Sequence, residues 1–267
     1  MKSVFRFLGL VLLAGLALQI YFAARIALMA VVNPESTAFQ RSEVWRIATN
    51  TGALRWRQQW VPYADISDAL KRAVIASEDA TFNEHDGLDI EALEKAWDKN
   101  TRAEERATQL ANRIVGRTSA PKATASPAVA KPAKIIGGST ITQQLAKNLF
   151  LSGERTLLRK GQELVLTVML ETLLSKQRIL EIYLNSVEWG EGVFGAEAAA
   201  QHYHRKSASR LSPFEAARLA VMLPRPKYFE TRPQSGYLNA RAATIAARMA
   251  SVFSTNGFMK AITAAAF

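Results

Sequence analysis

A long apolar run near the N-terminus constrains the fold of this chain more than any other feature. Residues 7–24 contain one polar member, Gln19, and the apolar pattern resumes after Arg25. About 20 apolar residues are enough to span the hydrocarbon core of a bilayer. Residues 1–33 are therefore predicted to form a short cytoplasmic start followed by a single transmembrane helix.

The charges beside this run predict its orientation. Lys2 and Arg6 precede it, and positive charge favours the cytoplasmic side, so everything after Pro34 should be exported. A cleaved signal peptide begins in a similar way, but the run is long and no small-x-small cleavage site follows it. We favour an uncleaved anchor in a bacterial inner membrane, with a cysteine-free domain in the periplasm.

The net charge narrows the class of partner. Lys plus Arg number 34 and Asp plus Glu number 23, which leaves +11 and favours an anionic partner. Export argues against nucleic acid and leaves a membrane surface or a phosphorylated substrate. Without Cys, and with only three His, a thiolate or histidine metal site is not expected, so chemistry should come from carboxylates, hydroxyls, Lys and Arg.

The rest of the chain is predicted to be mostly α-helical, with no convincing strand pattern. Capping residues and apolar spacing predict helices over about 67–77, 88–115, 139–150, 156–174, 176–184, 212–224 and from 236 onward. We divide it into a membrane-proximal linker (34–62), a main domain (63–235) and a C-terminal helix (236–267). A basic insertion at 98–137 carries eight basic and three acidic residues, and its part 118–134 should be a flexible loop. A Trp- and Arg-rich patch at 54–60 fits either a headgroup interface or a linker with half-buried aromatics.

Two carboxylates follow the first predicted helix of the main domain. Glu78 and Asp79 should lie just past its end, where the negative end of the helix dipole and partial burial would raise a carboxylate's pKa and favour a general base. From spacing alone, an acidic surface turn is the better interpretation.

A polar stripe is predicted on the helix that begins near Ser139. Thr140, Gln144 and Lys147 fall on one face, opposite Ile141 and Leu145. Its hydroxyl and amide groups suit a sugar, although a solvated face is the alternative.

The next helix adds charge to this region. Arg159, Glu163 and Glu171 recur on one stripe, and the basic residues Lys147, Arg155, Arg159 and Lys160 fall within 14 positions. Such a cluster suits a diphosphate leaving group, whose growing negative charge cations would neutralise. Arg159 and Glu163 alone could be a simple i, i+4 ion pair. The glycine-containing segment 176–206 would, by itself, indicate packing and tight turns.

Taken together and in this order, these segments resemble the peptidoglycan glycosyltransferases of family 51. The matching patterns are EDxxFxxHxG at Glu78–Gly87, GxSTITQQxxKN at Gly137–Asn148, RKxxE at Arg159–Glu163 and ILExYLN at Ile179–Asn185. The resemblance covers roughly residues 60–226. It implies a lysozyme-like, mostly α fold that polymerises lipid II into β-1,4 glycan strands, with inversion at C1 and release of undecaprenyl diphosphate.

The resemblance also implies roles for individual residues. Glu78 would be the general base, and Glu163 a second catalytic carboxylate that assists at the leaving-group side or organises the basic cluster. The diphosphate would be held by Lys147, Arg155, Arg159 and Lys160. The sugar sites would be shaped by Asp79, Ser139, Thr140, Gln143, Gln144 and Asn148. No metal site and no cofactor is required, although a divalent cation at the diphosphate is compatible with the chemistry.

The partners implied are lipid II, the growing glycan chain and membrane lipid, with other cell-wall synthesis or division proteins as further candidates. Two rival functions stay open: a membrane-bound lytic transglycosylase or muramidase, and a non-catalytic scaffold. Since a diphosphate leaves without being protonated, the basic cluster favours synthesis over hydrolysis.

The chain departs from the family pattern in the 98–137 insertion, at His204 and at Arg225. The insertion falls where the family has its membrane-dipping jaw. Because 41 residues follow Pro226, no transpeptidase domain is expected.

Overall fold

Helices account for most of this computed structural model, which describes residues 2–91, 139–151 and 156–249 and isolated positions 94, 98, 101, 102, 105 and 109. They are α1 (Lys2–Leu28), α2 (Ala38–Thr51), α3 (Asp68–Glu78), α5 (Ile141–Phe150), α6 (Leu157–Leu173), α7 (Lys176–Ser186), α8 (Ala196–His204), α9 (Pro213–Met222) and α10 (Pro226–Glu230). Short 3₁₀ turns cover Tyr63–Asp65 and Ala208–Arg210, and residues 236–249 are also helical. The predicted mostly α fold is confirmed.

The chain divides into two compact units, residues 1–87 with 140–267, and residues 88–139. In the second unit the described positions between 90 and 109 are helical, as predicted, and the predicted loop 118–134 lies outside the described residues. All contacts below belong to the first unit.

Capping residues set the helix boundaries, as the sequence predicts. The side chains of Ser67 and Thr156 accept the amides of Leu70 and Arg159, and Ser212 forms a capping box with Glu215. One start is corrected: the helix expected from Ser139 begins at Ile141.

Its cap is Thr140, which accepts the amide of Gln143, while the Gln143 side chain accepts the amide of Thr140. This reciprocal pair satisfies two backbone donors, which favours Thr140 over the preceding Ser139 as the N-cap of α5.

Three short strands form a sheet that the sequence analysis missed. β1 (Arg57–Gln58) pairs parallel with β3 (Val193–Phe194), which pairs antiparallel with β2 (Glu188–Gly190). Strands of two or three residues are too short to show an alternating pattern. The turn between β2 and β3 needs Gly192, because its φ is +72° and a Cβ there would lie 2.5 Å from the Arg55 carbonyl oxygen.

The segment predicted as a linker contains β1 and a well-anchored helix, α2. Gln40 of α2 is buried and donates to the Ser186 carbonyl at 2.9 Å, and Ile47 is fully buried. The Trp56 ring lies 5.3 Å from that of Phe194. For the Trp- and Arg-rich patch at 54–60, these contacts support a linker with half-buried aromatic side chains rather than a headgroup interface.

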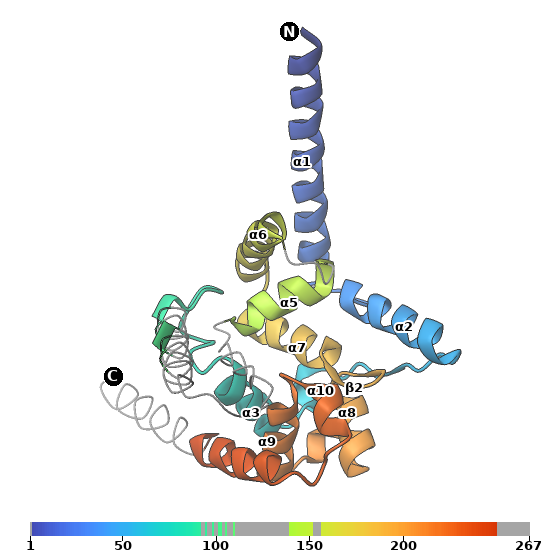
Figure 1. Cartoon of the computed structure of the whole chain (residues 1–267), viewed down its shortest axis with the longest axis vertical. Helices are drawn as coiled ribbons and strands as arrows, with labels where there is room; N and C mark the ends of the chain where they lie inside the picture. The colour runs from blue at the N-terminus through green and yellow to red at the C-terminus, as the bar shows by residue number, and fades with distance from the viewer. Residues whose placement is uncertain are drawn as a thin grey trace, which may run out of the picture. The chain divides into compact units, whose positions relative to one another are not determined.

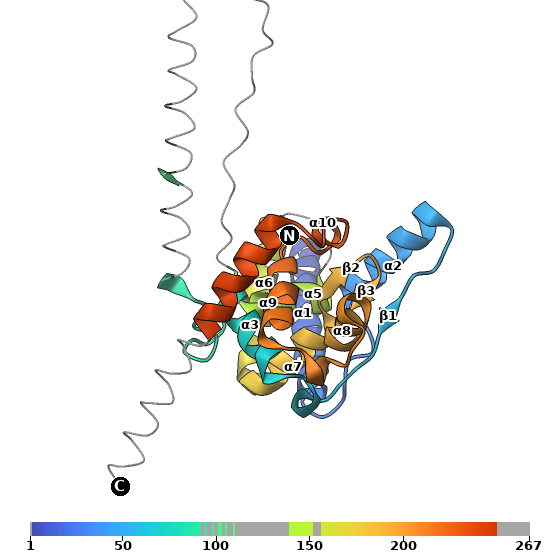
Figure 2. The same ribbon diagram turned by 90° about the horizontal axis from the view of Figure 1, so that it is seen from below.

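The core of the first unit places α5 among α2, α6 and α7, while α3 lies alongside α9 (Figures 1 and 2). Its largest fully buried side chains include Trp189, Tyr183, Phe82 and Phe194. Because α5 is packed on three sides by helices, side chains on its remaining face are held in fixed positions.

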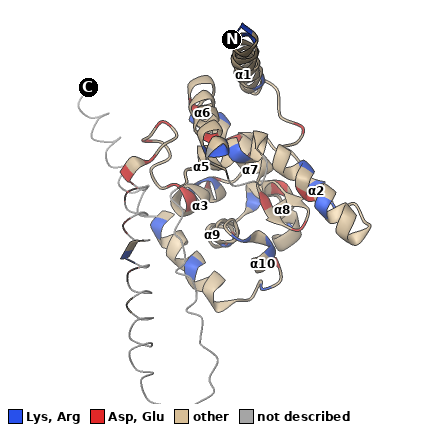
Figure 3. Ribbon diagram, turned by 45° about the horizontal axis from the view of Figure 1, so that its top comes forward, with Lys and Arg blue, Asp and Glu red and all other residues tan. Residues whose placement is uncertain are grey.

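Helix α1 is long and apolar enough to cross a membrane by length and composition. In Figure 3 its ribbon is almost entirely tan, with blue at the N-terminal end. Its side chains over residues 2–18 are exposed, whereas Ile26 near its end is buried. The helix contacts α6, so it fits a membrane anchor that also packs on the rest of the unit.

Candidate active site

Glu78 is the last residue of α3 and is followed by the C-cap residue Asp79. The Gln144 amide donates to Glu78 Oε2 at 3.1 Å. Burial raises the pKa of Glu78, and the charge of Asp79 adds to this, while hydrogen bonds from Gln144 and Ser77 act in the opposite direction. The acidic surface turn favoured from spacing alone is wrong, because Glu78 is half-buried and Asp79 is buried. The alternative, a carboxylate of raised pKa, agrees with the structure, with burial as the largest cause.

Tyr183 of α7 orients the amide that contacts Glu78. Its hydroxyl donates to Gln144 Oε1 at 2.9 Å, which leaves the Gln144 amide hydrogens to face the carboxylate. Burial, with the charges of Glu78 and Asp79, holds the pKa of Tyr183 well above its ordinary value, so the phenol stays a donor. Sequence reasoning missed Tyr183, although it is the tyrosine of the ILExYLN pattern.

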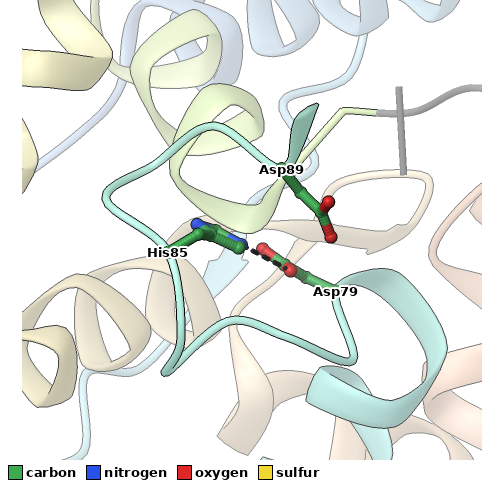
Figure 4. A group of neighbouring side chains, drawn as sticks. All are labelled: Asp79, His85 and Asp89. Atoms are coloured by element: carbon green, nitrogen blue, oxygen red, sulfur yellow. Dashed lines mark hydrogen bonds and ion pairs between the residues drawn. The ribbon is translucent and has the colours of Figure 1, made fainter. Parts of the chain in front are cut away.

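Asp79 connects the end of α3 to two other segments. Its Oδ1 accepts a hydrogen bond from His85 Nε2 at 2.8 Å (Figure 4), and its Oδ2 accepts from the Ile141 amide at 3.0 Å. The Gly87 amide donates to His85 Nδ1, so the ring hydrogen lies on Nε2. Both oxygens of Asp79 are thus engaged within the protein, which gives this predicted sugar-binding residue a positioning role.

The turn after α3 packs tightly against α6. Gly87 has a φ of +84°, and a Cβ there would lie 2.7 Å from Thr167 Cγ2. Its carbonyl accepts from the Thr140 hydroxyl at 2.7 Å. The polar groups of Thr140 and Gln143 therefore serve the cap of α5 and this turn. Of the other predicted sugar-binding residues, Ser139 is exposed and Asn148 is half-buried on α5.

Glu163 of α6 is buried and gathers basic side chains around it. Its side chain is 5% exposed, and it pairs with Arg159 at 3.0 Å and with Lys160. Partial desolvation lowers the pKa of Lys147, as do Arg159 and Lys160, while Glu163 opposes the change. Glu163 and three of the four predicted diphosphate-binding residues are thus brought together. The fourth, Arg155, lies outside the described residues.

Helix α5 carries contacts to both charged groups. Gln144 reaches Glu78, and Lys147, three residues later on the same face, lies within the field of Arg159, Lys160 and Glu163. A general base and a set of cations on one helix suit the transfer of a group from an anionic leaving group to a hydroxyl acceptor.

A second acidic cluster is formed by residues of α2, β2 and the β2–β3 turn. Carboxylate oxygens of Glu43, Glu188 and Glu191 lie within 4.8 Å of one another, as in a cation site. However, the ammonium of Lys227 pairs with Glu43 and lies 3.4 Å from Glu188 and 3.6 Å from Glu191. The position that a metal ion would take is therefore held by a side-chain cation.

This cluster makes stability depend on pH. Burial raises the pKa of Glu188 to about 7 from 4.5, so the unfolded chain loses this proton first as the pH rises. We expect a loss of about 3 kcal/mol of stability between pH 4.5 and 7 from this residue alone. In Glu188→Gln the melting temperature should fall less between pH 5 and pH 8 than in the parent protein. The surface control Glu84→Gln should show the same decrease in melting temperature as the parent protein. If Glu188→Gln also shows the parent's decrease, this prediction is wrong.

Comparison with known proteins finds a matching family model and similar proteins. The model of the transglycosylase family matches residues 46–112 and 119–250. A biosynthetic peptidoglycan transglycosylase of Burkholderia thailandensis is 53% identical over 236 residues, which cover 88% of this chain and 81% of that protein. Proteins of the same name from Burkholderia orbicola (strain MC0-3) and Burkholderia pseudomallei are 51% and 52% identical over the same share of this chain, covering 85% and 81% of their own lengths.

Proposed function

Because this chain belongs to the transglycosylase family and is a peptidoglycan glycosyltransferase of cell wall synthesis, we propose that Glu78 and the Lys147 cluster carry out its polymerisation of lipid II. The observation that carries this proposal is that one helix, α5, contacts both the proposed base and the basic cluster. Gln144 holds a Glu78 carboxylate of raised pKa, and Lys147 belongs to a cluster of cations.

In the proposed reaction, Glu78 accepts the proton of the acceptor sugar 4-hydroxyl while that oxygen attacks C1 of the donor. The new C1–O bond forms as the bond from C1 to the diphosphate oxygen breaks, so the electron pair leaves with undecaprenyl diphosphate and C1 inverts. A positioned base contributes about 10²- to 10⁴-fold to such a step. Lys147 and Arg159 would stabilise the charge that grows on the diphosphate.

We assign Glu163 to the organisation of the basic cluster. Its carboxylate is bound by Arg159 and Lys160, which keeps both cations near Lys147 although all three repel one another. A buried anion that is paired twice in this way is suited to holding cations in place.

We place the protein in the bacterial inner membrane as a single-pass protein with the catalytic domain in the periplasm. The apolar α1 supports the anchor, and Lys2 and Arg6 in its first turns support a cytoplasmic N-terminus. Further partners among cell-wall synthesis or division proteins stay a prediction from the sequence.

The function is tested with the full-length protein in lipid vesicles that contain lipid II. Polymerised glycan is the expected product. Soluble muropeptides released from cell-wall sacculi would support a lytic enzyme instead, and no product from either substrate would support a scaffold. We propose that no bound cofactor is needed, so polymer should still form in the presence of a chelator. A complete loss there would assign a divalent cation to the diphosphate.

Tyr183→Phe should test the orientation of Gln144. Without the hydroxyl, the Gln144 amide loses the bond that orients it toward Glu78, so the hydrogen bond that lowers the pKa of Glu78 weakens. We expect kcat to fall by about tenfold and the acidic limb of the pH–rate profile to move to higher pH. Tyr237→Phe, at an exposed tyrosine, is the matched control. A movement of the limb to lower pH would contradict the assignment.

A further inference from the structure

Two glutamines form a reciprocal amide pair between α1 and α6. Gln19 Nε2 donates to Gln162 Oε1 at 2.9 Å, and Gln162 Nε2 donates to Gln19 Oε1 at 3.1 Å. Gln19 is the polar residue of the apolar run 7–24. A polar side chain within a membrane helix is costly unless it is paired, and pairs of this kind hold membrane helices together.

The pair lies where the apolar run of α1 approaches residue types that are common at a membrane interface. Six residues separate Gln19 from Arg25, which is about 9 Å along a helix axis. Arg25 lies beside Tyr21, 3.4 Å from its hydroxyl, and both residue types are common at membrane interfaces. On α6, the apolar side chains of Leu158 and Val168 are 88% and 50% exposed, as suits contact with lipid.

Further contacts join the end of α1 to the helices that carry the site. The Phe22 ring packs edge-on against Phe150, the last residue of α5, at 5.2 Å between centroids. Arg178 of α7 donates to the Met29 carbonyl at 2.7 Å and to Asn33 at 2.8 Å. The anchor is thus fastened to α5, α6 and α7, which bear Gln144, Glu163 and Tyr183 (Figure 1).

We propose that Gln19 and Gln162 are positioning residues that set the depth of α6 in the bilayer. Gln162 directly precedes Glu163, so the pair holds Glu163 and its two cations at the level of the substrate diphosphate. Neither glutamine touches the reacting atoms in this arrangement. The inference rests on the proposed function.

Loss of the pair should affect substrate capture more than the chemical step. The contacts among Glu78, Gln144 and Tyr183 do not involve α1, so the base stays in place when α6 moves along the anchor. The lipid II KM should therefore rise while kcat changes little.

The depth of α6 is measured first, without reference to activity. Since the chain has no Cys, Val168→Cys gives a single attachment site for a nitroxide on α6. The full-length protein is placed in vesicles of phosphatidylethanolamine and phosphatidylglycerol, and the nitroxide depth is measured by electron paramagnetic resonance. Gln19→Leu and Gln162→Leu should each shift or broaden the depth distribution, whereas Gln59→Leu, at an exposed glutamine, should not. Identical distributions in all four proteins would overturn the proposal.

Kinetics in the same vesicles supply the second readout, with the unlabelled variants. Each Gln→Leu variant should raise the lipid II KM by about three- to tenfold with kcat within twofold, which is the range of interhelical hydrogen bonds in membranes. The double variant should be no worse than either single one, because both remove one interaction. Additive losses, or a fall in kcat at unchanged KM, would overturn the positioning role. If the parent protein makes no polymer, the proposed function fails, and the depth measurement still decides whether the pair positions α6.

Discussion

Glu78→Gln should lower the rate of lipid II polymerisation by about 10²- to 10⁴-fold while the protein stays folded. The amide is nearly isosteric with the carboxylate, but it cannot accept the proton of the acceptor hydroxyl. Because burial is the main cause of the raised pKa of Glu78, neutralising this group should not reduce the melting temperature. The measurement is the initial rate of glycan formation in vesicles, together with the melting temperature.

Glu84→Gln is the matched control for this change. Glu84 lies six residues later in the turn after α3, where it is exposed. The Glu84→Gln variant should polymerise lipid II at the same rate as the parent protein. A Glu78→Gln protein with substantial activity would remove Glu78 as the base, whatever the behaviour of the control.

Lys147→Met should lower kcat/KM for lipid II by about 10²- to 10³-fold, the range seen when one group that stabilises a developing charge is removed. Met keeps the length of the side chain and removes its charge. Burial is the largest cause of the lowered pKa of Lys147, and the charges of Arg159 and Lys160 add to it, so an anion bound there would relieve the repulsion among the three cations. As the pH rises and Lys147 gives up its proton, the rate of the parent protein should fall toward that of the variant, so the difference between the two should shrink.

The control for charge removal is Lys206→Met. Lys206 pairs with Glu215 at 2.8 Å near the start of α9, and the ion pairs found among the described residues do not join it to the proposed site. Its variant should retain polymerisation. Equal losses in both Lys variants would indicate a general effect of net charge on vesicle binding and would contradict a diphosphate site at Lys147.

The features predicted well from the sequence are those encoded by neighbouring residues. The caps Ser67, Thr156 and Ser212 act within three positions of themselves. Glu163 pairs with Arg159 and Lys160, which are four and three positions away. Helix α2 was missed because part of its anchoring is polar: buried Gln40 bonds to a carbonyl 146 residues away. A hydrophobic pattern cannot show such a contact.

Roles that depend on distant contacts also escaped the sequence analysis. Tyr183 and Gln144 are 39 residues apart, and the oxygens of Asp79 are shared between His85 and the amide of Ile141. The predicted end of one helix at Asn185 is corrected for a similar reason. Asn185 lies within α7, and its side-chain amide bonds the Val61 backbone in both directions. Contacts between distant segments of the chain, rather than local helix propensity, determine which hydrogen bonds these polar side chains make.

A polymerase must release its product by one repeat and engage it again in every cycle, and the mounting of two groups on α5 limits how this enzyme could do so. Gln144 and Lys147 are separated by three residues of helix, about 4.5 Å of rise, and cannot move apart. Gln144 bonds to Glu78 of α3 and to Tyr183 of α7, and Lys147 interacts with charged groups of α6. We therefore expect the glycan strand to advance past two groups whose spacing α5 keeps constant.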